Sequence, residues 1–340
     1  MALRLSVLDQ SPISEGSTGA QALRNTINLA QLADALGYHR YWLAEHHGGP
    51  MLAGPSPEAL IGPVAAATER IRVGSGGVML PHYSPFKVAE SFSVLAGLFP
   101  GRIDLGIGRA AGTDPMTTHA LQRDRSRALP DDFPQQLAEL LAYYEDAIPR
   151  SSPLARLAAV LPGRPETPDV WLLGSSPQSA VWAGQLGLPY AFADFINPAG
   201  SEIAALYRRE FAEGLRLEAP RTAVALWALA AESEEEAVRL SASSRMAFSM
   251  LRRGRLIPVP PPDVAERFLA QEGDGLGGRR RTVVGTAAQV LAGIEAVAAD
   301  YGAEEVIVVT ITYDHEARRR SYELIAAAFG RSVAPSTLVA

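Results

Sequence analysis

The residues best suited to chemistry in this 340-residue chain stand together in the segment Glu45-His46-His47. The segment follows an apolar run, Tyr38–Ala44, and precedes the flexible pair Gly48-Gly49. Histidine changes charge near neutral pH, so the segment fits acid–base chemistry or contact with a bound molecule. Adjacent histidines on an extended chain point to opposite sides and chelate one metal poorly, and no clear His/Asp set completes a coordination sphere. We expect an acid–base or ligand-facing histidine and no metal; histidines held by loop hydrogen bonds are the alternative.

A second candidate is the turn Gly174-Ser175-Ser176-Pro177-Gln178-Ser179, which opens a helical pattern. Free backbone N–H groups, serine hydroxyls and the helix dipole together favour an anion. An ordinary serine N-cap explains the same residues equally well. Arg109, which follows another expected strand, shifts the balance towards a phosphate because a guanidinium can bind phosphate oxygens in pairs.

A third candidate is the glycine-rich strand Ile71–Leu80, which contains Gly74-Ser75-Gly76-Gly77. Glycine inside a strand usually marks a bulge or a close approach by a ligand. We expect a flat ligand against the backbone at Gly76 and Gly77, with a structural bulge as the alternative.

The elements that position these groups alternate regularly between strand and helix. Apolar runs of strand length recur eight times, each followed by a segment with helical spacing. The expected strands are Leu3–Leu8, Tyr38–Ala44, Ile71–Leu80, Arg102–Ile107, Val170–Leu173, Leu188–Ala193, Thr222–Ala230 and Glu305–Thr312. This alternation predicts an α/β fold, a closed (β/α)₈ TIM barrel, in which chemistry lies at the carboxyl ends of the strands. A doubly wound open sheet is the runner-up, but the turn Asp9-Gln10-Ser11-Pro12 lacks its glycine fingerprint.

We expect one domain over residues 1–340, with extended loops at 110–132, 149–168 and 251–282. The last of these contains Pro260-Pro261-Pro262, a glycine-rich run and Arg279-Arg280-Arg281, and we expect it to be irregular. The basic runs fit solvated loops.

Composition excludes several classes of protein. The chain is 47% hydrophobic and carries a net charge of -6, which argues against a nucleic-acid partner. It has no cysteine, so disulfides and thiolate sites are absent. The N-terminus reaches Asp9 too soon for a signal sequence, and no apolar run approaches the ~18 residues of a membrane helix. We therefore expect a cytoplasmic protein with no membrane association.

Four motifs in order closely resemble the bacterial luciferase-like flavin monooxygenases. They are Trp42-Leu43-Ala44-Glu45-His46-His47, Val73–Pro81, Gly101–Arg109, and Leu173-Gly174-Ser175-Ser176 with Gly187-Leu188-Pro189. The opening segment, Leu8-Asp9-Gln10-Ser11-Pro12, is similar to the uncharacterised oxidoreductases of that family. The resemblance covers the chain from the first strand to about residue 195 and returns at Thr310–Ala326.

The resemblance implies a barrel that binds reduced FMN. His46 matches the catalytic histidine near the flavin ring, with Glu45 as a candidate to set its tautomer. Gly76 and Gly77 match a pair that forms a cis peptide beneath the ring. Arg109, Ser176 and Ser179 match phosphate ligands, and Gly174 and Ser175 complete the turn.

The resemblance also implies a homodimer formed through Pro57–Thr68 and Pro85–Leu98. Gly108 stands where the luciferase catalytic subunit has a reactive cysteine, and no long lid is evident, which argues against light emission.

The expected function is that of an FMN-dependent two-component monooxygenase. A separate NAD(P)H:flavin reductase would supply FMNH2, and O2 would oxygenate a small apolar substrate such as an aldehyde or ketone. A deazaflavin-dependent reductase or dehydrogenase on the same barrel, or a flavin-binding protein without turnover, are the alternatives.

Overall fold

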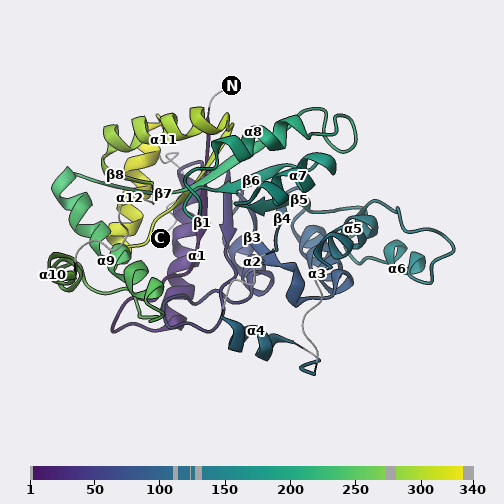
Figure 1. The fold of residues 1–340 in the computed structure, drawn as a ribbon, viewed down its shortest axis with the longest axis horizontal. Helices are drawn as coiled ribbons and strands as arrows, with labels where there is room; N and C mark the ends of the chain where they lie inside the picture. The colour runs from purple at the N-terminus through teal and green to yellow at the C-terminus, as the bar shows by residue number, and fades with distance from the viewer. Residues whose placement is uncertain (1–2, 110–113, 123, 127–131, 273–280, 332–340) are drawn as a thin grey trace.

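Eight parallel strands close into a barrel in the computed structural model, which describes residues 3–109, 114–122, 124–126, 132–272 and 281–331 (Figure 1). The ring order is β1-β2-β3-β4-β5-β6-β7-β9, and β9 pairs back to β1. These strands are β1 (Arg4–Asp9), β2 (Arg40–Leu43), β3 (Arg72–Met79), β4 (Ile103–Gly108), β5 (Asp169–Gly174), β6 (Tyr190–Ala193), β7 (Thr222–Ala231) and β9 (Glu305–Val309). The predicted single-domain (β/α)₈ barrel is confirmed.

Helices surround the ring, as Figure 1 shows. Those that follow or precede ring strands are α1 (Gly19–Ala35), α2 (Pro57–Ala66), α3 (Pro85–Leu98, after the 3₁₀ turn η1, Leu80–His82), α5 (Phe133–Tyr144), α7 (Pro177–Gln185), α8 (Ser201–Arg209), α9 (Glu234–Arg252), α11 (Ala287–Tyr301) and α12 (His315–Ala328). Neighbouring helices contact one another, and α12 packs against α1 to complete the outer layer.

The helix boundaries follow local chemistry. Thr286 forms a capping box with Gln289 at the start of α11, and Gly302 ends that helix in the left-handed conformation. Ser233 caps α9 by accepting a hydrogen bond from the Glu236 N–H.

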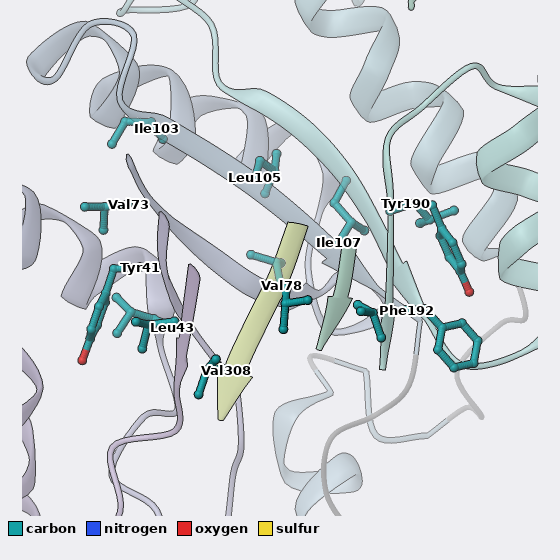
Figure 2. Packing of buried hydrophobic residues seen from close by; sticks show 14 of the residues in the cluster. Tyr41, Leu43, Val73, Val78, Ile103, Leu105, Ile107, Tyr190, Phe192 and Val308 are labelled. Carbon is teal, nitrogen blue, oxygen red and sulfur yellow. The ribbon is translucent and has the colours of Figure 1, made fainter. Parts of the chain in front are cut away.

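The main core lies between the strands and the helices. Figure 2 shows side chains of this layer, among them Tyr41 and Leu43 on β2, Val73 on β3 and Ile103 on β4. Both faces of a parallel strand are covered, which explains why the strand sequences are almost continuously apolar.

The inside of the ring holds a buried ionic cluster that the sequence did not reveal. Arg40 pairs with Asp104 at 2.7 Å and with Glu305 at 2.9 Å, and its guanidinium lies over the Trp171 ring. The Trp42 indole N–H donates to the same Asp104 carboxylate. These groups fill the barrel interior beneath the strand ends.

Three segments expected as loops contain regular structure. Helix α4 (Pro115–Leu121) lies within 110–132 and apart from the other helices at the lower edge of Figure 1; residues 110–113, 123 and 127–131 lie outside the described part. Helix α6 (Ala155–Ala159) lies within 149–168.

The expectation of irregular structure over 251–282 was wrong. Helix α10 (Pro262–Glu272) packs on α9, and strand β8 (Thr282–Thr286) pairs with the second half of β7, outside the ring. Residues 273–280, including Arg279 and Arg280, lie outside the described part. Among the helices described, none is long and apolar enough to cross a membrane.

Candidate active site

A cavity of about 440 Å³ opens at the carboxyl ends of the ring strands. Its wall includes the end of β2, the glycines of β3, the residue after β4, and the turn between β5 and α7. The nine residues that the resemblance assigned to the site all contribute to it, whereas His47 does not: Glu45, His46, Gly76, Gly77, Arg109, Gly174, Ser175, Ser176 and Ser179. The volume is within the usual range for small-molecule sites.

His46 and its neighbour Glu45 have different surroundings. The His46 Nε2 lies 3.3 Å from the side-chain nitrogen of Gln10, and its backbone N–H donates to the Gly54 carbonyl. Glu45 is fully buried, and its carboxylate lies 2.8 Å from the His47 Nε2 and accepts hydrogen bonds from the Met79 N–H and the Tyr83 hydroxyl. Glu45 thereby ties the end of β2 to the end of β3, whereas His46 lies beside Gln10, the residue that follows β1.

The glycines of β3 lie where the strand departs from regular pairing. The register with β4 shifts between Gly76 and Val78, and the Gly76-Gly77 peptide bond is cis, as the resemblance implies. A Cβ on Gly76 would lie 2.5 Å from Leu8, and one on Gly77 would lie 2.6 Å from Leu173. The bulge is therefore present, the space beside each glycine is occupied by Leu8 or Leu173, and both glycines line the cavity.

The turn before α7 adds polar groups to the cavity wall. The Ser176 hydroxyl accepts a hydrogen bond from the Ser179 N–H, and the Ser179 hydroxyl lies 2.9 Å from that of Tyr190. Burial raises the pKa of Tyr190 to about 12, so its hydroxyl keeps its proton near neutral pH. A Cβ on Gly174 would lie 2.2 Å from the Ser179 hydroxyl oxygen, so only glycine fits this turn. Arg109 also lines the cavity, with its guanidinium 5.6 Å from the centre of the Trp182 ring.

The sequence did not single out Gln10, which lines the cavity beside His46. The turn that carries it is held by Asp9, whose carboxylate accepts hydrogen bonds from the Ser11 N–H, the Tyr41 hydroxyl and Arg318. Burial raises the pKa of Asp9, but Arg318 and the two other donors outweigh it and leave the pKa below its usual value. Ser11 takes a φ of 50°, a conformation that non-glycine residues rarely adopt, so this turn is specified by its contacts.

Large apolar side chains make up much of the remaining wall. They include Leu8, Trp42, Leu173, Phe195, Ile196 and Ile307. The cavity therefore combines a mostly apolar lining with a few polar groups at fixed places, which is typical of a small-molecule site.

Comparison with known proteins identifies the family. The family model described as Luciferase-like monooxygenase matches residues 3–305. A luciferase-like monooxygenase of Escherichia coli strain K12 is 40% identical over 95% of this chain and 96% of its own length. The chain belongs to the luciferase-like monooxygenase family. This is a family of flavin-dependent oxidoreductases, as the motifs predicted.

Other relatives are similar over their full length. Uncharacterised protein YwcH of Bacillus subtilis strain 168 is 46% identical over 96% of this chain and 98% of its own. The solved structure of apo-MsnO8 superposes with a TM-score of 0.90 at 41% identity, covering 98% of this chain and 99% of the other. The oxygenating constituent of 3,6-diketocamphane monooxygenase from Pseudomonas putida, solved with FMN, shares the fold with a TM-score of 0.72 at 21% identity, over 99% of both chains.

Proposed function

We propose that this chain is the oxygenating component of an FMN-dependent two-component monooxygenase. Reduced FMN, supplied by a separate NAD(P)H:flavin reductase, would provide the electrons that activate O2 for transfer of one oxygen atom to a small apolar substrate. The observation that supports this most is the cavity that brings together His46, the glycines of β3, Arg109 after β4 and the serine turn before α7.

The residues of the cavity fit such a cofactor. Arg109, which follows β4, and Ser176, which caps α7, offer donors to a phosphate. The Gly76-Gly77 part of the wall has no side chain that would hinder a flat ring. The buried carbonyl oxygen of Gln10 has no hydrogen-bond partner among the described residues. Such an atom is costly unless a bound molecule satisfies it.

Each polar residue then has a role. His46 holds or transfers a proton at its Nε2, the nitrogen beside Gln10. Glu45, which we expected to be catalytic, would act by fixing the ends of β2 and β3 through His47, Tyr83 and Met79. Arg109 with Ser175, Ser176 and Ser179 would hold the phosphate, with Gly174 allowing the tight turn. The apolar wall would exclude water from the reacting groups.

The residues that line the cavity also favour particular classes of substrate. The apolar wall favours an aldehyde or a ketone, and the diketocamphane enzyme, a Baeyer–Villiger monooxygenase, shares the fold. A relative from B. subtilis strain 168, 37% identical over 95% of this chain, is named an N-acetyl-S-alkylcysteine monooxygenase, which adds a thioether sulfur as a second candidate acceptor of oxygen.

We further propose a homodimer in which α2 and α3 form the interface. Helix α3 exposes two large apolar side chains, Val94 at 44% and Leu98 at 66%. Exposed apolar side chains on one helix favour a protein contact over solvent.

The deciding experiment is anaerobic reconstitution with FMNH2, followed by mixing with O2 in the presence of an aldehyde, a ketone or an alkyl thioether. We expect flavin oxidation coupled to product that contains one ¹⁸O atom from ¹⁸O2. Turnover only with reduced deazaflavin, and without oxygen, would show the reductase alternative. A flavin that stays bound and gives no product with the whole panel would favour a binding protein.

The variant pair His46→Gln and His119→Gln tests the role of His46 in this assay. His119 is an exposed histidine on α4. We expect His46→Gln to bind FMN but to form at least about tenfold less product per O2 consumed, in line with the loss of a general acid or base. His119→Gln should behave as the parent protein. An equal yield of product per O2 consumed in the two variants would show that His46 has no role in the proposed mechanism.

A further inference from the structure

Gln10 is a buried amide that meets His46 on one side and the cavity on the other. Its side chain is only 6% exposed, yet it belongs to the cavity wall. Its nitrogen lies 3.3 Å from the His46 Nε2, and its oxygen has no partner among the described residues. One end of the amide therefore serves the histidine, and the other end remains for a bound molecule.

The protonation state of His46 and the orientation of the Gln10 amide are linked. A neutral imidazole has one N–H and one acceptor nitrogen, whereas the charged form has two N–H groups. When the Gln10 NH2 group donates to the His46 Nε2, the neutral ring must carry its proton on Nδ1. When Nε2 also becomes protonated, two donors face each other, and the contact survives only if the amide turns by about half a turn to present its oxygen.

We propose that Gln10 is a positioning residue for His46, which fixes the tautomer of the neutral ring and reverses its amide when the ring becomes charged. The cavity wall then offers a carbonyl acceptor beside neutral His46 and an NH2 donor beside charged His46. A bound N–H or O–H group is favoured when His46 is neutral, and a bound carbonyl or oxyanion is favoured when His46 is charged. The inference extends the proposed function, but the coupling between the two side chains is a property of the protein alone.

The charged side chains around the cavity have partners of their own. The other charged side chains that line the cavity within the described residues are Glu45 and Arg109. Glu45 accepts hydrogen bonds from the Met79 N–H and the Tyr83 hydroxyl and lies against His47. The Arg109 guanidinium lies over the Trp182 ring. Behind Gln10, Asp9 and Arg318 form a buried pair at 2.7 Å whose charges cancel.

The test is nitrogen NMR of the histidine rings in the full-length protein without flavin, with the His46 signal assigned from its loss in His46→Gln. We expect parent His46 to be the Nδ1–H tautomer when neutral. In Gln10→Met, which has a similar shape and no amide, we expect the Nε2–H tautomer to become predominant. Gln135→Met, an exposed position on α5, should leave the signal unchanged.

Two further readouts make the test independent of the folding of one variant. The Gln10 side-chain NH2 signals should shift with the same pH midpoint as His46, and this shift should vanish in His46→Gln. Gln10→Glu, which places a carboxylate beside the ring, should raise the pKa of His46 by about one unit or more. An unchanged His46 tautomer in folded Gln10→Met, or Gln10 signals that ignore the His46 titration, would overturn the inference. Either result would leave the proposed flavin chemistry untouched.

Discussion

Arg109 is the cationic side chain of the proposed phosphate site. Replacing it with alanine should weaken FMN binding about 10- to 100-fold, which corresponds to about 1.5–3 kcal/mol for a lost charged hydrogen bond. Riboflavin, which lacks the phosphate, should bind parent and variant equally. Fluorescence titration with both compounds measures the difference.

Arg150→Ala provides the matched control, since Arg150 is exposed and lies outside the cavity wall. Equal loss of affinity for FMN and riboflavin in Arg109→Ala would mean that Arg109 supports the ring or the fold instead of the phosphate.

Asp9 is the buried carboxylate that holds the turn carrying Gln10. Its pKa is lower in the folded chain than in the unfolded chain, so its stabilisation is present above the unfolded value of about 3.8 and is lost as pH falls towards the folded value. Asp9→Asn leaves Arg318 buried without a counter-charge and should lower the free energy of unfolding by about 3–5 kcal/mol at pH 7. Urea unfolding at pH 7 and at successively lower pH should show the deficit shrinking below about pH 4.

Asp263→Asn is the control for Asp9→Asn. Asp263 forms an exposed ion pair with Arg267 on α10, and such pairs contribute about 0–1 kcal/mol. Similar losses of stability in the two variants would contradict the importance assigned to the buried pair.

At the scale of elements, the segment between α6 and β5 packs on α3 through a close backbone contact. The Gly163 N–H donates to the Ser93 hydroxyl, and a Cβ on Gly163 would lie 1.8 Å from the Ser93 carbonyl oxygen. Gly163→Ala must therefore move one segment away from the other, and we expect a loss of about 1–3 kcal/mol in the free energy of unfolding.

Gly62→Ala is the comparison with the same chemical change and no close contact between segments. Gly62 lies within α2 directly before Pro63, and apart from its chain neighbours its added Cβ would meet only Leu95, at an ordinary 3.8 Å. We expect the free energy of unfolding to change by less than about 1 kcal/mol, because the gain in helix propensity is offset by the conflict between the new Cβ and the proline ring. Thermal unfolding of both variants checks the pair, and a larger loss of stability in Gly62→Ala would show that the space around α2 is tighter than the contact indicates.

Helix α10 and strand β8 were not predicted, because their sequence patterns are weak or depend on residues far apart in the chain. Helix α10 begins with Pro262 at its first turn, a favourable position for proline, but the preceding prolines suggested a loop. Strand β8 has only five residues and is defined by its partner β7, which lies about 50 residues earlier.

At the scale of the whole molecule, the barrel was predictable because strand and helix alternate along nearly the full chain. Barrel topology then gathers the strand ends, so predicted site residues from four separate segments of the chain lie around one cavity. The contact between Gln10 and His46 and the cluster around Arg40 could not be predicted, because each depends on side-chain orientation between distant strands.

The proposed dimer gives a prediction at the same scale. Leu98→Glu places a charge among the exposed apolar side chains of α3 and should shift the protein from dimer to monomer in analytical ultracentrifugation. Leu215→Glu is the control, since Leu215 is similarly exposed, at 56%, but follows α8. A monomeric parent protein, or a dimer that tolerates Leu98→Glu, would refute an interface at Leu98.

One edge of strand β7 pairs with β6, and the other edge is divided between two partners. Its first half closes the ring with β9, as far as Trp227 and Val309, and its second half pairs with β8. The hydrogen bonds that close the ring therefore do not involve β8, or the helices α9 and α10 that precede it in the chain. In evolutionary terms, this part of the chain can diverge between relatives while the ring and its cavity residues stay intact.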